Sequence, residues 1–350
     1  MNLNHIRLQS HRLTGSQFTT PEEAVAWMGA VQAQSDKVAE WAVGLRTKDC
    51  NEVAVKAALD SGSILRTHVL RPTWHFVTPE NIRWMLRLTG ERIKAALRSF
   101  DARFPMSEAD HHRGYDLLGK LLGGGRSMTR QELADEFVKR GFSLDTPRRM
   151  AHLLMLAEAD ALVCSGVMKG RSQTYALLDE RAPDSLSLSD DEALARLAML
   201  YFRSHAPATL ADFSWWSGLP LTVARTAVAS LGSDVTAETW QEQTYYIHSD
   251  APAGSRTMAS AQLLPAYDEF LIAYRDRSQV LQPRHYARAF SNNGIFQPVV
   301  LWRGRVVGNW KCIAKKGSSA YEYTWFEGEK TPSERQLRQA EKRYSYFMGG

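Results

Sequence analysis

Cysteine is scarce in this chain of 350 residues. The three cysteines, Cys50, Cys164 and Cys312, lie far apart and form no Cys-x-x-Cys pair. Disulfide frameworks and structural zinc sites need paired or closely spaced cysteines, so neither is indicated. We expect three buried free thiols, no metal and no other cofactor.

Long apolar runs are missing as well. No run of about 18 apolar residues is present, and residues 1–15 lack the apolar core that a secretory signal requires. The sequence therefore predicts a cytoplasmic protein that does not bind a membrane.

The signatures of the common enzyme classes are also absent. The chain has no Walker-type or Gly-x-Gly-x-x-Gly loop, no His-Glu-x-x-His, no Gly-x-Ser-x-Gly and no metal-spaced His/Cys cluster. Each of these motifs supplies the groups of one chemistry, such as phosphate binding or a nucleophile. The function must rest on less conspicuous residues.

Positive charge is present but unevenly distributed. The chain carries 43 Lys+Arg and 38 Asp+Glu, a net charge of +5. The balance is −1 over residues 1–60, +4 over 61–180, −5 over 181–250 and +7 over 251–350. A polyanion such as DNA would be attracted mainly to the second and fourth segments.

Helical periodicity dominates, and short hairpins follow groups of three helices. One helix runs from Tyr115 to Leu122, a second follows a capping box made by Thr129 and Glu132, and a third lies around 148–154. A hairpin follows between Ala161 and Leu178. Three helices and a hairpin form the winged-helix order.

Similar patterns occur on both sides of this segment. Helices are predicted at about 21–31, 36–46, 51–60, 80–98, 191–204, 208–216 and 221–231, with strands at 63–71 and 73–77. In the last of these groups only Arg225 could contact base edges, so that module is predicted to be scaffold. Strands are predicted at 299–302, 305–310 and 321–326, with a hairpin turn at Arg303-Gly304 and a basic helix at 333–346.

The predicted fold class is mainly α with β wings. It comprises three tandem winged-helix modules and a C-terminal β-barrel-like domain. The modules are expected at 1–100, 101–183 and 184–255, and the β-rich domain at 256–350.

Two polar stretches in the first module stand out. One is Gln32-Ala33-Gln34, between the first two helices, and the other contains His68, Arg71, Trp74 and His75. Judged from spacing alone, the two glutamines are more simply explained as exposed residues at a helix end.

The order of these stretches resembles the AlkZ/YcaQ-like winged-helix DNA glycosylases. In that family the catalytic motif is Gln-x-Gln or Gln-x-Asp with an apolar middle residue, which Gln32-Ala33-Gln34 matches, although Ala33 is smaller than the usual residue. The similarity extends through 209–220, 264–277 and 304–310. It implies Gln32 and Gln34 as catalytic residues and hydrolysis of N7-alkylated purines, including interstrand crosslinks in some members.

The expected partner is double-stranded DNA that contains alkylated or crosslinked bases, bound by a monomer that associates with the nucleoid. Alkylation at N7 gives the purine a positive charge and makes it a good leaving group. A neutral glutamine can hold water against the anomeric carbon without acting as a base. An Asp or Glu would be a true base, so a glutamine pair predicts selectivity for labile cationic lesions.

The second stretch offers supporting roles. Alternation along a strand would place His68 and Trp74 on one face, and Arg71 and His75 on the other. Arg71 could hold a phosphate beside the lesion, and His68 or His75 could orient the water. Purely structural roles explain these residues equally well.

Basic residues near turns are candidates for contact with the DNA backbone. Those in the hairpin turn 168–172 are Lys169 and Arg171, and those in the β-rich domain are Arg303, Arg305, Lys311, Lys315 and Lys316. A solvated basic surface is the alternative. For Asp268, Glu269 and Asp276, pairing with Arg275 and Arg277 to fix the β-rich domain explains the acidic residues as well as a role in the site does.

Two other functions remain open from the sequence. A non-enzymatic winged-helix DNA-binding or transcriptional regulatory protein would need the same modules and charge but not the glutamine pair. A resistance protein that sequesters a DNA-damaging drug could use the ten tryptophans for stacking.

Overall fold

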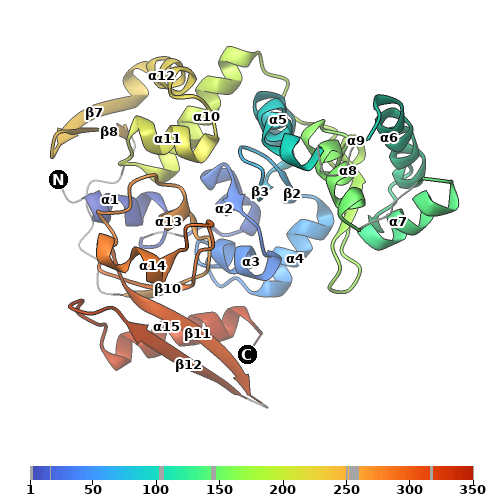
Figure 1. Ribbon diagram of the computed structural model, residues 1–350. Helices are drawn as coiled ribbons and strands as arrows, with labels where there is room; N and C mark the ends of the chain where they lie inside the picture. The colour runs from blue at the N-terminus through green and yellow to red at the C-terminus, as the bar shows by residue number, and fades with distance from the viewer. Residues whose placement is uncertain are drawn as a thin grey trace. The chain divides into compact units, whose positions relative to one another are not determined.

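The computed structural model describes residues 3–15, 17–101, 106–142, 147–249, 251, 260–315 and 318–349. The chain forms two compact units (Figure 1). Unit 1 comprises Met1–Val55 and Ala195–Gly350, and unit 2 comprises Lys56–Leu194. The chain passes between the units within helices α4 (Glu52–Ser61) and α10 (Asp190–His205). The module boundaries inferred from the sequence stay predictions.

Unit 2 contains five further helices and two small groups of strands. The helices are α5 (Pro79–Asp101), α6 (Glu108–Leu122), α7 (Arg130–Lys139), α8 (Pro147–Ala159) and α9 (Leu178–Arg181). The strands are β2 (Leu65–His68), β3 (Trp74–Val77), β4 (Met128–Thr129), β5 (Val163–Ser165) and β6 (Thr174–Leu177). The last three form a sheet in the order β4-β6-β5.

The capping box expected in unit 2 is confirmed. The Thr129 hydroxyl accepts from the Glu132 N–H at 3.2 Å, and Glu132 Oε2 accepts from the Thr129 N–H at 2.7 Å. This reciprocal pair satisfies two of the N–H groups that a helix start leaves without partners. The helices and the hairpin predicted between residues 115 and 178 are all present as α6, α7, α8, β5 and β6.

Apolar burial explains how α6, α7 and α8 pack together. Leu118 and Leu122 of α6, Leu133 and Phe137 of α7 and Leu153 of α8 are fully buried in one cluster. These positions recur at helical spacing on the inner face of each helix. Burial of these apolar side chains therefore holds α6, α7 and α8 together, and the β5–β6 hairpin packs on these helices.

Unit 1 contains the start and the second half of the chain. Its helices are α1 (Leu3–Ser10), α2 (Pro21–Met28), α3 (Asp36–Gly44), α11 (Leu210–Ser217), α12 (Leu221–Ala229), α13 (Glu269–Ile272), α14 (Tyr286–Ala289), α15 (Glu334–Phe347) and the short 3-10 turns η1 (Gly232–Asp234) and η2 (Pro283–His285). Its strands are β1 (Val31–Gln32), β7 (Val235–Trp240), β8 (Gln243–His248), β9 (Ala261–Leu264), β10 (Val299–Trp302), β11 (Arg305–Lys315) and β12 (Ser318–Trp325). The helices α1, α13 and α14 and the strands β1, β7, β8 and β9 were not predicted.

The C-terminal β-rich part is an open sheet. Its four antiparallel strands lie in the order β12-β11-β10-β9 (Figure 1). Strands β9 and β12 are its two edges, and α15 packs against β9. The expected barrel-like closure is not found in the described part of the chain. The Arg303-Gly304 hairpin turn is confirmed, with φ of 50° and 74°, as a tight two-residue turn requires.

Helix α15 packs against α3. The Trp41 ring lies 5.1 Å from the rings of both Tyr344 and Phe347, measured between centroids. Gly44 allows this close approach, because a Cβ there would come within 2.5 Å of the Phe347 ring. Arg343 donates a hydrogen bond to the Leu45 carbonyl at 2.5 Å. The helix that follows the glutamine motif is thus held by a segment about 300 residues further along the chain, as the separation of 298 between Arg343 and Leu45 shows.

Candidate active site

The two glutamines of the motif differ in their surroundings. Helix α2 ends at Met28, and Gln32 is the last residue of β1. Gln32 is 5% exposed and Ala33 is fully buried, whereas Gln34 is exposed. The interpretation of both glutamines as exposed residues at a helix end is therefore wrong for Gln32. The burial of Ala33 suits the small side chain at the middle position.

The backbone of Gln32 is fixed by a buried carboxylate. The Gln32 N–H donates to Glu269 Oε1 at 2.7 Å. The indole N–H of Trp216 donates to Oε2 of the same carboxylate at 3.2 Å, and His205 Nε2 lies 3.6 Å from that oxygen. Glu269, Trp216 and His205 are all fully buried. Sequence reasoning did not assign Glu269 this contact.

A buried ion pair supports the helix that carries Glu269. Both terminal nitrogens of Arg46 donate to the two oxygens of Asp268, each at 2.9 Å. Asp268 Oδ1 also accepts from the Phe270 N–H at 2.9 Å and so caps α13. The expected pairing of Asp268 with Arg275 or Arg277 is wrong, because the partner comes from α3's end, far away in sequence.

Glu269 and Asp276, the other two acidic residues of that prediction, bond to other groups. Glu269 bonds to Gln32 and Trp216, and Asp276 accepts from the backbone and hydroxyl of Ser278 at 2.9 and 3.0 Å. Arg277 instead donates to the Leu271 carbonyl at 2.7 Å. Local turn geometry thus engages Asp276, and its pairing with Arg275 or Arg277 stays a prediction.

Two buried histidines lie in the same network. The Tyr274 hydroxyl donates to the His205 carbonyl at 2.6 Å and lies 2.8 Å from His11 Nε2. Because that hydroxyl has one proton, His11 Nε2 is the donor to Tyr274. Burial lowers the pKa of His11 well below its usual value, with His205 and Arg46 adding to the effect. Burial also lowers the pKa of His205, although Glu269 opposes the shift.

The second polar stretch forms the β2–β3 hairpin of unit 2. His68 pairs with Trp74 across the strands, and their ring centroids are 4.4 Å apart. Their predicted position on one face is confirmed. His75 pairs with Thr67 on the neighbouring register position. Arg71 lies in the turn between the strands, so strand alternation does not place it.

The hairpin histidines have structural partners within unit 2. His68 Nδ1 bonds to the buried carboxylate of Glu158 on α8. His75 Nδ1 donates to the Thr73 carbonyl at 2.9 Å, and burial, assisted by Arg71, lowers the His75 pKa to about 3. His75 is therefore neutral at physiological pH. Gln32 and Gln34 belong to unit 1, and joint action with this hairpin stays a prediction.

The predicted DNA-contacting residues of the β5–β6 turn are both exposed. Lys169 Nζ pairs with the Glu132 carboxylate at 2.7 and 2.8 Å, whereas Arg171 projects from the same turn without a carboxylate partner among the described residues. Exposed pairs of this kind are weak and exchange readily with other anions. Contact with DNA stays a prediction for both.

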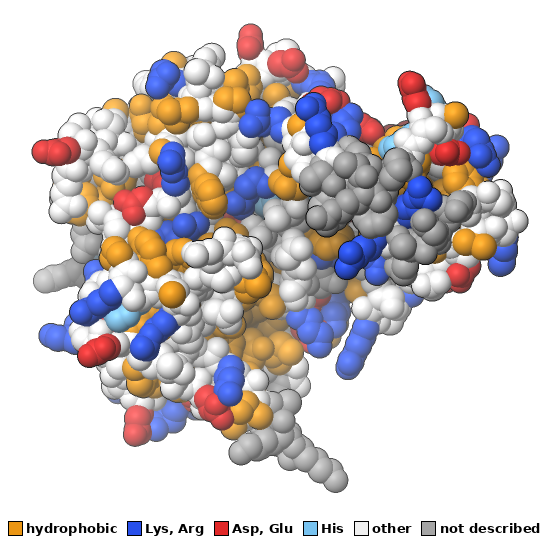
Figure 2. All heavy atoms as spheres, viewed as in Figure 1, with side chains coloured by type: hydrophobic (Ala, Val, Ile, Leu, Met, Phe, Trp, Pro, Cys, Tyr) orange, Lys and Arg blue, Asp and Glu red, His pale blue; other side chains and the backbone are white. Residues whose placement is uncertain are grey.

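The predicted basic residues of the C-terminal sheet fall into two groups. Arg305 pairs with Glu329 at 3.3 Å and Lys311 with Glu322 at 2.8 Å. Arg303 is exposed and stacks over Trp302, with its guanidinium carbon 4.5 Å from the ring centroid. The Lys315 side chain and Lys316 lie outside the described residues. On the face shown in Figure 2, Lys and Arg side chains are scattered with acidic ones between them.

Cysteine environments agree with the prediction in part. Cys50 and Cys164 are buried free thiols, and burial raises their pKa values to about 11 and about 12. Cys312 is only half-buried, because it lies in the outer hairpin formed by β11. In the described part of the chain, no three His, Cys, Asp or Glu side chains are grouped to bind a metal, and no helix could span a membrane.

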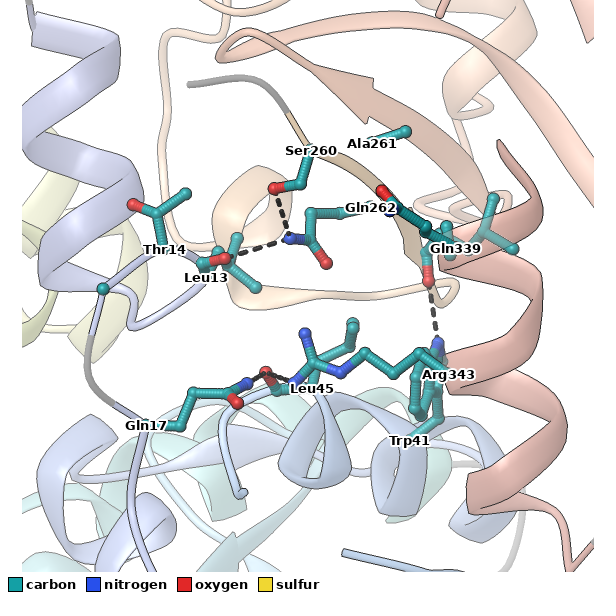
Figure 3. Close-up of a pocket in the computed structure, with 13 residues that line it drawn as sticks. Leu13, Thr14, Gln17, Trp41, Leu45, Ser260, Ala261, Gln262, Gln339 and Arg343 are labelled. Atoms are coloured by element: carbon teal, nitrogen blue, oxygen red, sulfur yellow. Dashed lines mark hydrogen bonds between the residues drawn. The ribbon is translucent and has the colours of Figure 1, made fainter. Parts of the chain in front are cut away.

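A cavity of about 430 Å³ lies within unit 1, away from the motif's own side chains (Figure 3). Its walls come from the α1–α2 connection, α3, β9 and α15. Gln17 and Arg343 both donate to the Leu45 carbonyl, at 2.7 and 2.5 Å. Neither Gln32 nor Gln34 lines this cavity. Of its polar groups, Arg343 links α15 to the end of α3.

Comparison with known proteins defines the class of this fold and site. The structure superposes on that of Streptomyces sahachiroi DNA glycosylase AlkZ with a TM-score of 0.84 and 21% identity, covering 99% of this chain and 95% of that one. In sequence, the chain is 25% identical over 326 residues to the Interstrand DNA cross-link repair glycosylase of Streptomyces sahachiroi, covering 88% of this chain and 86% of the relative.

The sequence profile of the family described as DNA glycosylase AlkZ-like matches residues 25–347. The chain belongs to the AlkZ-like DNA glycosylase family, as its motif order suggested. It is therefore a hydrolase of N-glycosyl bonds in DNA.

Proposed function

We propose that this glycosylase hydrolyses the N-glycosidic bond of N7-alkylated purines in duplex DNA, with a water held by Gln32 and Gln34. We further propose that it unhooks interstrand crosslinks. The name of the Streptomyces sahachiroi relative describes crosslink repair by that protein, and the similarity of 326 aligned residues supports a related substrate here.

The proposal rests on one observation, the contrast between the two glutamines. The Gln32 N–H is tied to Glu269, and Gln32 is buried, while Gln34 is exposed two residues later. A buried amide has few rotamers open to it, so it can hold a water in one place. An exposed amide beside it can reach a nucleotide. Positioning of this kind lowers the entropy cost of water attack.

The chemistry of the motif fits a cationic leaving group. An amide oxygen accepts and an amide N–H₂ donates, but neither takes a proton at physiological pH. A purine alkylated at N7 already carries positive charge, so departure of the base needs no general acid. Normal purines lack that charge and should remain intact.

Binding of duplex DNA is proposed to use three winged-helix modules and the C-terminal sheet. Arg171 and Arg303, two of the exposed cations among the predicted contacts, are placed at turns from which a side chain can reach a phosphate. A crosslinked base is tied to the opposite strand and cannot be extruded into a deep pocket. The proposed site is therefore open to the duplex.

The test is base excision on a panel of lesions. Duplexes with a single N7-methylguanine, bulkier N7 adducts or an N7-linked interstrand crosslink are incubated with the protein and treated with hot alkali. Strand breaks at the lesion are expected, and none at normal purines. No cleavage above the enzyme-free control on any lesion would refute the proposed substrate class.

A further inference from the structure

We infer that Glu269 is a positioning residue of the glycosylase site that also supplies the negative charge which the neutral glutamine pair lacks. The inference rests on the proposed role of Gln32. It assigns a task to a carboxylate that is neither part of the motif nor near it in sequence.

The geometry links Glu269 to the motif directly. Its Oε1 accepts from the Gln32 N–H at 2.7 Å, and its Oε2 accepts from Trp216 Nε1 at 3.2 Å. Both partners are obligate donors, so both oxygens act as acceptors, as suits a carboxylate. The rigid indole of Trp216 and the short helix α13 leave the carboxylate one orientation, and this in turn fixes Gln32.

The charges around Glu269 are not balanced. The two arginines in the network have other partners, since Arg46 binds Asp268 at 2.9 Å and Arg7 lies 4.0 Å from Asp212. Among the described residues, no Lys or Arg pairs with Glu269. His205, its one basic neighbour, has a lowered pKa and is neutral at physiological pH.

His11 is neutral for the same reason. The buried network thus holds two formal positive charges, on Arg7 and Arg46, against three carboxylates, on Asp212, Asp268 and Glu269. Of these three carboxylates, Glu269 is the one without an arginine partner, and it is hydrogen-bonded to the residue that is proposed to hold the water.

Burial of a charge without an ion partner has a large unfavourable free energy of desolvation, and burial of a neutral amide has a smaller one. A cation does arise in the proposed reaction, because the sugar develops oxocarbenium character as the base departs. Charge in a low-dielectric interior is poorly screened, so Glu269 would stabilise that cation without contacting it. The neutral glutamines can then orient water while the carboxylate behind them provides the electrostatic field.

The decisive variant is Glu269→Gln, which retains an amide oxygen for the Gln32 N–H and removes only the charge. The amide N–H₂ of that glutamine would face the Trp216 indole N–H, and two donors cannot form a hydrogen bond with each other. A second variant, Glu269→Gln with Trp216→Phe, removes this conflict. Trp216→Phe alone is the reference for the double variant, and Glu341→Gln is the matched control for the loss of a carboxylate elsewhere in unit 1. Glu341 is a carboxylate of α15 that accepts from the Tyr323 hydroxyl at 2.6 Å.

In single-turnover excision of N7-methylguanine, loss of the Glu269 charge should lower the rate by about 10- to 100-fold, which corresponds to about 1.4–2.7 kcal/mol of lost transition-state stabilisation. The Kd for lesion DNA and the melting temperature should stay near wild type. Glu341→Gln should excise at the wild-type rate, and the double variant should excise more slowly than Trp216→Phe alone. A wild-type rate in the double variant would overturn the inference, since the hydrogen bond alone would then suffice.

Gln32→Ala, measured in parallel, separates this inference from the proposed function. If Gln32→Ala is inactive while the charge variants are fully active, only the role of Glu269 fails. If Gln32→Ala excises normally, the proposed function fails as well.

A binding experiment on the wild-type protein needs no variant. DNA with a cationic pyrrolidine in place of the abasic sugar mimics the oxocarbenium, and a tetrahydrofuran analogue is its neutral counterpart. The wild-type protein should bind the cationic analogue more tightly, and Glu269→Gln should reduce that preference. Equal affinity of the wild-type protein for the two analogues would refute the electrostatic role.

Discussion

Arg46 and Asp268 form a fully buried, bidentate ion pair that joins the end of α3 to the cap of α13, with both N–O distances at 2.9 Å. One helix follows the glutamine motif, and the other begins with Glu269. Neither charge is hydrated in the folded protein. Removal of one partner therefore leaves the other as an unpaired charge in a low-dielectric interior.

Arg46→Met should therefore lower the free energy of unfolding by about 3–5 kcal/mol. The paired replacement of Arg46→Met and Asp268→Leu should cost less than Arg46→Met alone, because no unpaired charge remains. Urea denaturation followed by tryptophan fluorescence measures both. A double variant less stable than the single one would contradict this account of the pair.

Loss of either motif glutamine should reduce excision by about 100-fold or more, the cost of a misplaced reactant. Gln34 is exposed, so Gln34→Ala should leave stability within about 0.5 kcal/mol of wild type. Gln32→Ala should lose some stability too, because it empties buried volume. Gln17→Ala, a glutamine of the same unit outside the motif, is the control, and a comparable loss of activity in it would argue against the assignment.

Charge reversal at Arg303 should weaken binding to all duplexes and lower the magnitude of the salt slope by about one. Arg303 is exposed on the β10–β11 turn. Arg225→Glu makes the same change of charge on α12 in the acidic segment and should have little effect. Fluorescence anisotropy over a range of salt concentrations compares the two, and equal slopes would remove Arg303 from the DNA-contacting surface.

His75 should make stability depend on pH. Its pKa is about 3 in the folded chain, against about 6.5 for a free histidine. Below pH 6.5 the unfolded chain therefore binds a proton that the folded chain does not. The contribution of neutral His75 to the free energy of unfolding is fully present above pH 6.5. It falls by about 1.4 kcal/mol per pH unit as the pH drops toward 3.

His75→Asn keeps a donor for the Thr73 carbonyl and removes the titration. As the pH falls, the unfolding free energy of this variant should decrease less steeply than that of the wild type. The difference in slope should correspond to at most one proton fewer taken up on unfolding. Denaturation curves at pH 7, 6 and 5 give the two slopes. Identical slopes would show that His75 does not contribute to the acid sensitivity.

Much of the fold could be predicted because its signals are local. The Thr129 and Glu132 capping box fixes a helix start within four residues, and alternating β-branched and aromatic residues marked the strands at 299–302 and 305–310. Whether the C-terminal sheet closes into a barrel could not be predicted from local signals. It depends on whether β9 and β12 meet, and no local pattern encodes the pairing of two edges.

The glutamine motif could be found by resemblance, but its support could not. Glu269 lies 237 residues from Gln32, and nothing in its neighbourhood distinguishes it from the adjacent Asp268. The partner of each became clear only from the structure, which brings Gln32 to Glu269 and Arg46 to Asp268. A run of apolar residues that contains two acids, such as 264–270, is the signal that could have raised the question.

The contact between α15 and α3 has a consequence for synthesis of the protein. Trp41 and Gly44 are made early, but the rings of Tyr344 and Phe347 that hold them come from the ribosome more than 300 residues later, as their residue numbers show. A chain interrupted before α15 would carry both motif glutamines and Glu269 without this clamp. Incomplete chains should therefore lack a rigid motif, so that the glycosylase matures only once α15 has been made.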